Sequence, residues 1–450
     1  MKQLLYPILA AALCLGACTK GDFLNKKPRT NLVVPSTLTD FQALLDNDIM
    51  NQSPAMGEIT ADNFYVKDGF QQTMPLKDLN TVLWKTDIYE GTGNVEDWNT
   101  PYKQVFTANV VLEGIQKLPV SADWEHVKGS ALFYRAHAFY QLATVFAAAY
   151  DATTAKSDLG IPLKLASDVN ENISRGNLQQ TFDRILTDLH EAVNLLSADF
   201  PATLRNRPSR PAAMALLSRV YLYMRDYERA GLYADSSLQL YNKLIDYNAV
   251  ASALFPFTRL NDETLFQCRL TTNYVLLGIA APGTIIDSNL YKSYTTGDLR
   301  PSLFFRASSA GGWSLGGSYN QSVNPFSGLA TDEVYLNRAE CYARAGKINE
   351  AISDLNTLRA KRFAPSSYVA LSATTKEEAL AFVLAERRKE LPFRSTRFTD
   401  LKRLNKEGYN IHLKRISNGQ TYELVPNDPR YVMPIPPDEI NITGIPQNQR

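Results

Sequence analysis

One segment of the sequence has the form of a catalytic motif. Residues 312–316 read Gly-Trp-Ser-Leu-Gly, which matches the G-x-S-x-G pattern around the nucleophile of many serine hydrolases. Such a nucleophile needs a strand directly before the motif and a helix directly after it. Ser-Ser-Ala-Gly precedes this motif, Gly-Ser-Tyr-Asn follows it, and the single later histidine is His412. The flanks therefore do not fit a hydrolase that uses Ser314.

The residue types that hold metals or nucleotides are not grouped in the sequence. Its four histidines are scattered, with no H-E-x-x-H spacing, and no C-x-x-C, P-loop or G-x-G-x-x-G motif is present. We therefore expect no metal site and no cofactor. Paired carboxylates for glycoside hydrolysis stay open as an alternative, because 46 acidic residues offer many pairs and the sequence gives no distances between them.

Recognition of sugars is a second kind of chemistry, and it requires no reactive group. Aromatic rings stack on the apolar faces of sugars, while polar side chains bond the hydroxyls. Two segments, about 50–100 and 255–330, are rich in Gly, Asn, Ser, Thr and aromatic residues. Within them we select eight candidate ligand contacts: Asp62, Asn63, Trp84, Tyr89, Tyr274, Tyr291, Trp313 and Tyr319. Core packing is the alternative for each. It explains Trp313 least well, because glycine pairs flank it.

The charge balance gives no reason to expect nucleic acid as a partner. The chain has 47 Lys and Arg residues against 46 Asp and Glu residues, so no excess of positive charge is available for phosphates. The run at 386–390 (Glu-Arg-Arg-Lys-Glu) alternates in sign on a predicted helix. We expect it to form a salt-bridged structural face and not an anion site.

Helices must provide the framework that positions these segments. Apolar periodicity predicts helices at about 124–146, at 182–196 and from Ser209 onward. Thr100 and Pro101 have the form of an N-cap and a first helical residue, and Thr375 with Glu378 forms a capping box.

An internal repeat links three of the predicted helices. Residues 132–139, 216–223 and 335–342 share one template, in which a large apolar residue is followed three positions later by Arg. Second helices at 227–238 and 349–358 follow the last two segments, as in tetratricopeptide units. The template arginines are 84 and 119 residues apart, far from the roughly 34-residue period of an uninterrupted array. We therefore predict a mainly α fold, an α-α superhelix of tetratricopeptide-like helix pairs with an inserted loop-rich lobe.

The N-terminus has the features of an export signal. Lys2 precedes a short apolar run, and Leu-Gly-Ala-Cys at 15–18 resembles a bacterial lipobox. We expect residues 1–17 to be a lipoprotein signal peptide, Cys18 to be lipidated, 18–31 to be a tether and 32–450 to form the folded domain. Thr19 stands at the position where an aspartate would retain a lipoprotein in the inner membrane, so the sequence favours the outer membrane. Of the other cysteines, Cys268 and Cys341 would remain after processing, and we expect both to be buried.

Taken in order, these segments resemble the SusD/RagB family of surface lipoproteins. The resemblance covers nearly the whole mature chain. Its parts are the lipobox with Asp-Phe-Leu at 22–24, Trp98-x-x-x-Tyr102, the repeat helix at 132–139, Gly-Ile-Pro-Leu at 160–163, the helix pairs at 213–230 and 335–359, the motifs at 386–391 and 397–403, Pro-Ile-Pro at 434–436 and Gln-Asn at 447–448.

The resemblance implies a function as well as a fold. It implies a glycan-binding protein without enzymatic activity, anchored by lipid to the outer membrane and facing the cell exterior. It also implies delivery of oligosaccharide to a SusC-like TonB-dependent transporter. Two alternatives remain: a peptide-binding member of the same uptake system, or a secreted glycoside hydrolase. Ligand residues of the family share little sequence, so the eight candidates depend on their residue types alone.

Overall fold

The computed structural model describes residues 34–91, 93, 95–271 and 275–450. The predicted signal peptide (1–17), Cys18, the tether (18–31) and Tyr274 lie outside the described residues. The chain divides into two compact units, Met1–Thr37 and Leu38–Arg450. All the elements below belong to the second unit.

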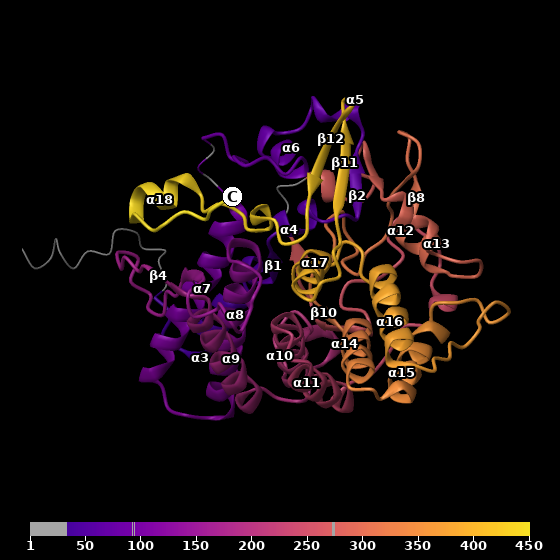
Figure 1. Cartoon of the computed structure of the whole chain (residues 1–450). Coiled ribbons are helices and arrows are strands. Elements are labelled where there is room, and N and C mark those ends of the chain that lie inside the picture. Colours follow the sequence, from indigo (N-terminus) through magenta and orange to yellow (C-terminus); the bar gives the residue numbers. More distant parts are fainter. Residues whose placement is uncertain (1–33, 92, 94, 272–274) are drawn as a thin grey trace, which may run out of the picture. The chain divides into compact units, whose positions relative to one another are not determined.

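Helices dominate the second unit, which confirms the predicted mainly α fold class. Eight of them form what we call the helical scaffold: α7 (Glu96–Gly114), α8 (Ala122–Phe146), α9 (Leu178–Leu195), α10 (Arg210–Met224), α11 (Tyr227–Leu240), α14 (Thr331–Arg344), α15 (Ile348–Ala360) and α16 (Lys376–Glu390). Each packs against the next along the row that Figure 1 shows from α7 to α16. Two further helices, α3 (Leu38–Leu45) and α17 (Arg397–Lys406), pack beside this row. Within the described residues, no helix is long and apolar enough to cross a membrane.

Side-chain caps fix where the scaffold helices begin. Ser121, Asn177, Ser209, Asp226 and Thr375 each accept a backbone N–H from the first turn of the helix that follows. An N-cap oxygen satisfies one of the four backbone donors that the first turn leaves without a partner. The starts predicted at Ser209 and Thr375 are therefore confirmed.

The start of α7 differs from the prediction. The helix begins at Glu96, so Pro101 lies inside it instead of at its first position. The Asp97 carboxylate fastens this earlier start to the chain, because its Oδ1 accepts the backbone N–H groups of Ala55 (2.5 Å) and Met56 (2.8 Å). The Thr-Pro pair was misleading because proline is common in the first turn, whereas here its missing N–H removes one bond of the second turn.

The three template arginines each bond a carboxylate on another scaffold helix. Arg135 on α8 binds Asp188 on α9 with two bonds of 2.8 and 2.9 Å. Arg219 on α10 binds Glu333 on α14, and Arg338 on α14 binds Asp354 on α15. The repeat therefore carries at least one buried or half-buried ion pair between helices in each unit, in addition to its apolar contacts. Arg338 forms a second one, with Asp235 on α11.

Shorter elements form what we call the strand-bearing region, at the top of Figure 1. It consists of α4 (Met56–Thr60), β2 (Phe64–Val66), α5 (Asp68–Gln71), α6 (Leu76–Val82), β7 (Thr284–Ile286), α12 (Ser288–Lys292), α13 (Arg300–Phe304), β8 (Phe305–Ala307), β9 (Trp313–Leu315), β11 (Leu413–Ser417) and β12 (Gln420–Leu424). The remaining strands are β1 (Gln52–Ser53), β3 (Leu159–Pro162), β4 (Arg175–Asn177), β5 (Thr264–Phe266), β6 (Arg269–Leu270) and β10 (Leu329–Ala330), and α18 (Pro437–Thr443) is the last helix.

Strand pairing joins the two segments that are far apart in sequence. β2 pairs antiparallel with β7, with Tyr65 opposite Ile285, and β1 pairs parallel with β6. The backbone N–H of Asp287 also donates to the carbonyl of Asn63 at 2.9 Å. Residues near 60 and residues near 285 are thus held side by side, although more than 200 positions separate them.

The charge run at 386–390 is salt-bridged but lies inside the protein, not on an exposed face. Glu386 and Glu390 are both buried on α16 and bond Arg300, whose side chain is fully buried. Glu390 also accepts from Arg362, which in turn reaches Glu263. Burial of such charges requires that each one be paired. The alternating charges at 386–390 predicted that these side chains would form ion pairs, but they did not predict that the pairs would be buried.

Candidate functional site

Two aromatic side chains form an exposed stacked pair in the strand-bearing region. The rings of Tyr291 on α12 and Trp313 on β9 lie 4.7 Å apart with an interplanar angle of 11°. Trp313 is 37% exposed, and it is the outward residue of a strand whose other two residues are buried. This aromatic pair presents a flat apolar surface to solvent, which is the geometry that stacks against a sugar ring.

A tight turn sets the position of Trp313. β8 and β9 pair antiparallel with Ala307 opposite Trp313, and the turn between them contains Gly311 and Gly312 at φ +82° and +79°. These positive φ values favour glycine. A Cβ at Gly312 would also lie 2.9 Å from the side chain of Ile285 on β7. The glycines flanking Trp313 therefore let the hairpin approach β7 closely.

A groove of about 310 Å³ lies between β2, the start of α12 and β11. Its lining mixes aromatic, aliphatic and charged side chains, from Asp62, Phe64, Tyr65, Trp84, Asp287, Leu413, Lys414, Arg415 and Ile416. Asp287 links the groove to the aromatic pair, because its side chain caps α12, the helix that carries Tyr291.

Asp62 is a fixed acceptor in this groove. Both of its carboxylate oxygens accept from Arg397, at 2.7 and 2.8 Å, and Arg388 lies 3.5 Å away. Although burial raises it, these two guanidinium groups hold the pKa of Asp62 well below its usual range. Asp62 is therefore ionised, and it can accept hydrogen bonds but cannot act as an acid.

Comparison with known families gives two matches along the chain. A family model described as starch-binding and associating with the outer membrane matches residues 22–222. A second model, described as the SusD family, matches residues 331–448. The chain belongs to the SusD/RagB family.

Solved structures agree with this assignment in fold. A SusD superfamily protein from Bacteroides thetaiotaomicron has a TM-score of 0.75 at 22% identity, over 92% of this chain and all of that one. A SusD-like carbohydrate binding protein from Bacteroides vulgatus has a TM-score of 0.68 at 19% identity, over 91% and 97%. Surface glycan-binding protein A from Bacteroides uniformis has a TM-score of 0.68 at 15% identity, over 92% and 99%. The predicted SusD-like fold is confirmed.

One curated relative is SusD-like protein P38 from Formosa agariphila. It is 24% identical over 181 residues, which span 39% of this chain and 31% of that protein. This SusD/RagB protein therefore matches about a third of the length of its curated relative.

Four of the predicted ligand contacts of this SusD/RagB protein are buried: Asn63, Trp84, Tyr89 and Tyr319. The Trp84 indole N–H donates to the carbonyl of Thr60 at 3.0 Å, and Trp84 lines the groove from this buried position. The Tyr89 hydroxyl donates to the carbonyl of Pro434, and that of Tyr319 to Glu263. Their polar atoms are used inside the protein. These four side chains are buried, whereas Asp62, Tyr291 and Trp313 are the accessible candidates.

Sequence reasoning missed three residues that line the groove. Tyr65 is 37% exposed and lies between Phe64 and Val66, which are both buried. This alternation over three residues is the period of a strand and could have singled out Tyr65. Asp287 and Lys414 carried no comparable signal, because only the pairing of distant strands brings them to the groove.

One group of carboxylates in the described residues has a spacing that could suit a metal ion: Glu263, Asp332 and Glu390. All three are buried, and arginines occupy their oxygens. Arg362 donates to Glu263 and Glu390, while Arg394 donates to Asp332. Burial raises the pKa of Glu263 to about 7. The guanidinium groups balance these charges, so the cluster is built as part of the buried ion network.

Two kinds of group that a hydrolase could use, carboxyl groups with a raised pKa and Ser314, are buried in the described structure. A catalytic acid requires a raised pKa at an accessible position. Among the described residues, every carboxyl group whose pKa is clearly raised is buried; these are Glu58, Asp78, Glu263, Asp332 and Asp354. Ser314 is also buried and lies within β9, not at a turn from strand to helix.

Proposed function

We propose that this protein binds an oligosaccharide at the cell surface and delivers it to a SusC-like TonB-dependent transporter in the outer membrane. The exposed stack of Tyr291 on Trp313 is the observation that carries the proposal. Family membership supports it, since several relatives of the same fold are described as carbohydrate or glycan binding.

The geometry divides recognition between the aromatic pair and the groove. A pyranose ring stacks on Trp313, and Tyr291 behind it holds the indole in a fixed orientation. Hydroxyls of the next sugar reach the groove, where Asp62 and Asp287 accept hydrogen bonds and Tyr65 offers both a ring and a hydroxyl. Because Asp62 is already held by Arg397, little side-chain freedom is lost on binding.

The proposed role requires binding and release, but no bond cleavage. Among the described residues, none of the carboxyl groups whose pKa is clearly raised lines the groove. We place the protein on the outer membrane through a lipid on Cys18, with residues 18–31 as a tether that leaves the sugar-binding surface free to face outward. One acyl chain holds a protein only weakly, and the several chains of a lipoprotein hold it firmly.

Titration of oligosaccharides into the full-length protein in detergent tests the proposal. We expect at least one neutral oligosaccharide from a broad panel to bind. Trp313→Ala should weaken that binding about thirty-fold, since an aromatic hot spot contributes about 2 kcal/mol. Phe106→Ala is the matched control, because Phe106 is 42% exposed but lies on α7, outside the aromatic pair and the groove.

Three results would change the conclusion. Binding of peptides from a parallel panel, with no glycan bound, would identify a peptide-binding member of the same system. New reducing ends released from a polysaccharide would identify a hydrolase. Equal losses in Trp313→Ala and Phe106→Ala would remove the aromatic pair from the site.

A further inference from the structure

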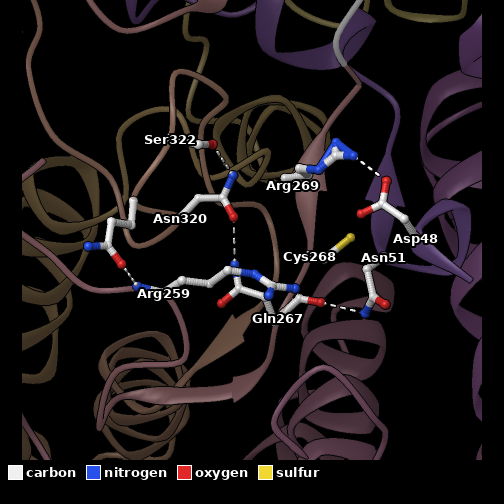
Figure 2. A pocket seen from close by; sticks show the side chains of 9 residues that line it. Asp48, Asn51, Arg259, Gln267, Cys268, Arg269, Asn320 and Ser322 are labelled. Carbon is white, nitrogen blue, oxygen red and sulfur yellow. Dashed lines mark hydrogen bonds and ion pairs between the residues drawn. The ribbon is translucent and has the colours of Figure 1, made fainter. Parts of the chain in front are cut away.

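A polar cavity of about 320 Å³ lies outside both the aromatic pair and the groove. None of the eight candidate contacts predicted from sequence lines it. Its lining comes from the 3-10 turn η1 (Asp48–Asn51), the chain entering β6, the loop at 320–322 and Arg259 (Figure 2). The lining residues are Asp48, Asn51, Arg259, Gln267, Cys268, Arg269, Asn320, Gln321 and Ser322.

The pairing of β1 with β6 assembles this cavity. Gln52 lies opposite Arg269 in that parallel pair, so the turn that carries Asp48 and Asn51 is held beside the segment 267–269. The side chain of Asn51 fastens the contact, because its Nδ2 donates to the carbonyls of Gln267 (2.7 Å) and Asn206 (2.8 Å). The floor of the cavity is therefore rigid.

Carboxamides and a hydroxyl form much of the lining and are oriented by one another. Gln267 Nε2 donates to Asn320 Oδ1 at 3.0 Å, and Asn320 Nδ2 donates to Ser322 Oγ at 2.7 Å (Figure 2). Gln267 and Asn320 are buried, so these bonds are shielded from water. Some capacity remains, since Gln267 keeps one N–H and Asn320 Oδ1 keeps one lone pair. Both N–H groups of Asn320 are used, by Ser322 Oγ and by the carbonyl of Asn324. Such groups match sugar hydroxyls, which both donate and accept.

The charged groups of the lining leave an excess of one positive charge. Arg269 Nη2 pairs with Asp48, while its Nη1 is buried and has no acceptor among the described residues. Arg259 is exposed, and no described carboxylate lies within ion-pair distance of its guanidinium group. A ligand that carries a carboxylate would supply the missing acceptor.

We propose that this cavity binds a carboxylate-bearing sugar, a uronic acid residue of the captured glycan. Its carboxylate accepts from Arg259 and Arg269, and its hydroxyls bond the carboxamides of Gln267, Asn320 and Gln321. The inference rests on the proposed function, and it adds the substrate class, an acidic glycan, and a second binding site.

The lining favours a sugar over other carboxylates. None of the nine lining residues is aromatic or aliphatic, so an acidic peptide would find no apolar contact for its side chains. A small inorganic anion would use the two arginines but would gain no hydrogen bond from the remaining capacity of the carboxamides. A uronate uses both sets of groups.

Isothermal titration of the full-length protein in detergent with trigalacturonate and maltotriose tests the proposal. Both are α-1,4-linked trisaccharides, but their rings also differ in configuration at C4. Fully methyl-esterified trigalacturonate, which has the same rings without the charges, is therefore titrated beside them. We expect trigalacturonate to bind at least about ten-fold more tightly, because a hydrogen bond to a charged group contributes about ten-fold or more in affinity. The difference should shrink as salt is added, since part of it is electrostatic.

Substitutions at Arg259 locate the site. Arg259→Gln should weaken trigalacturonate binding about ten-fold without changing the melting temperature, because the side chain is exposed. Arg259→Lys keeps the charge and should recover part of the loss. Arg184→Gln, an arginine on α9 distant in sequence from all lining residues, is the matched control and should bind as the wild type does.

Several outcomes would overturn the inference. These are equal binding of the two trisaccharides, an Arg259→Gln variant that binds as the wild type does, and full competition by sodium sulfate or by aspartate, which would show a general anion site.

Failure of the proposed glycan-binding function gives a different set of results. If maltotriose or another neutral glycan binds in a Trp313-dependent way while trigalacturonate gains nothing, the uronate site is wrong and the glycan-binding function stands. If no glycan binds at all, both are wrong.

Discussion

Arginines have opposite roles in the helical scaffold and around the polar cavity. In the scaffold, Arg135, Arg219 and Arg338 each bond a carboxylate of another helix, and the first two are buried. At the cavity, Arg259 has no carboxylate partner among the described residues, and Arg269 leaves one nitrogen without an acceptor. The three template arginines thus have carboxylate partners within the folded protein, whereas Arg259 and Arg269 keep N–H groups that can still donate to a ligand.

The absence of a carboxylate partner distinguishes Arg259 from the three template arginines, whereas a nitrogen without an acceptor also occurs in the scaffold, at Arg359 on α15. Burying an ion pair costs solvation that its attraction barely offsets, so a scaffold pair mainly fixes which helices meet. Removing one partner is much more costly, because the other charge stays buried and uncompensated. A ligand site has the reverse property, since its charges tolerate the absence of a partner until one binds.

The largest predicted effect comes from breaking a scaffold pair. Arg219→Met leaves Glu333 buried without its guanidinium partner, with a side chain only 2% exposed. We expect a loss of about 3–5 kcal/mol in the free energy of unfolding, measured by urea denaturation. Arg184→Met should lose less than about 1 kcal/mol, because its pair with Asp188 is long and partly exposed.

A double variant provides the control for this experiment. Arg219→Met combined with Glu333→Leu removes both charges and should recover much of the lost stability. If it is no more stable than Arg219→Met alone, the cost lies in packing and not in the unpaired charge.

A pair of buried glutamates extends the comparison to pH. Burial raises the pKa of Glu333, but Arg219 outweighs this effect and holds the pKa below its usual range. Glu58 accepts from Asn63 and from the backbone N–H of Ser395 but bonds no arginine directly, and burial raises its pKa to about 7. The two carboxyl groups should therefore respond to pH in opposite directions.

The direction in which Glu58 changes stability with pH follows from its protonation in the folded and unfolded states. Between pH 4.5 and 7 the unfolded chain has lost the proton that the folded protein retains, so stability falls as pH rises through this window. Glu58→Gln has no proton to lose at this position. Between pH 4.5 and pH 7.5, its free energy of unfolding should therefore fall by roughly 2–3 kcal/mol less than that of the wild type. Thermal unfolding across this pH range measures the difference. Glu125→Gln, at an exposed position of α8, should follow the wild-type curve; a parallel curve for Glu58→Gln would contradict the assignment.

The scaffold could be predicted from the sequence because its signals are local. Helix caps such as Ser209 and the 3.6-residue periodicity depend on neighbours within one or two turns. The template even marked the arginines that pair. Their partners could not be predicted, since Glu333 lies 114 residues beyond Arg219 and only the packed superhelix brings them together.

The candidate site was predicted only in part, for a physical reason. Tyr291 and Trp313 were both selected from sequence, but their stacking depends on a two-glycine turn and on a five-residue helix. Tyr89 and Tyr319 had the same composition around them and are buried. Tyr89 and Tyr319 lie outside helices and strands, where no periodicity shows which side is inward, so residue type alone could not separate these core tyrosines from surface ones.

The smallest predicted effect concerns Tyr291, which lies at the proposed ligand-binding surface and not in the helical scaffold. Tyr291→Phe keeps the ring that supports Trp313, so we expect unfolding free energy within about 0.5 kcal/mol of the wild type and oligosaccharide affinity within about two-fold. Tyr291→Ala removes the ring. An aromatic pair contributes about 0.5–1.5 kcal/mol beyond its buried area, so affinity should fall about three- to ten-fold while stability changes little. Titration of the neutral oligosaccharide into both variants measures the difference. A large loss in Tyr291→Phe would show that the hydroxyl bonds the ligand, and the role of Tyr291 would then change from supporting Trp313 to direct contact.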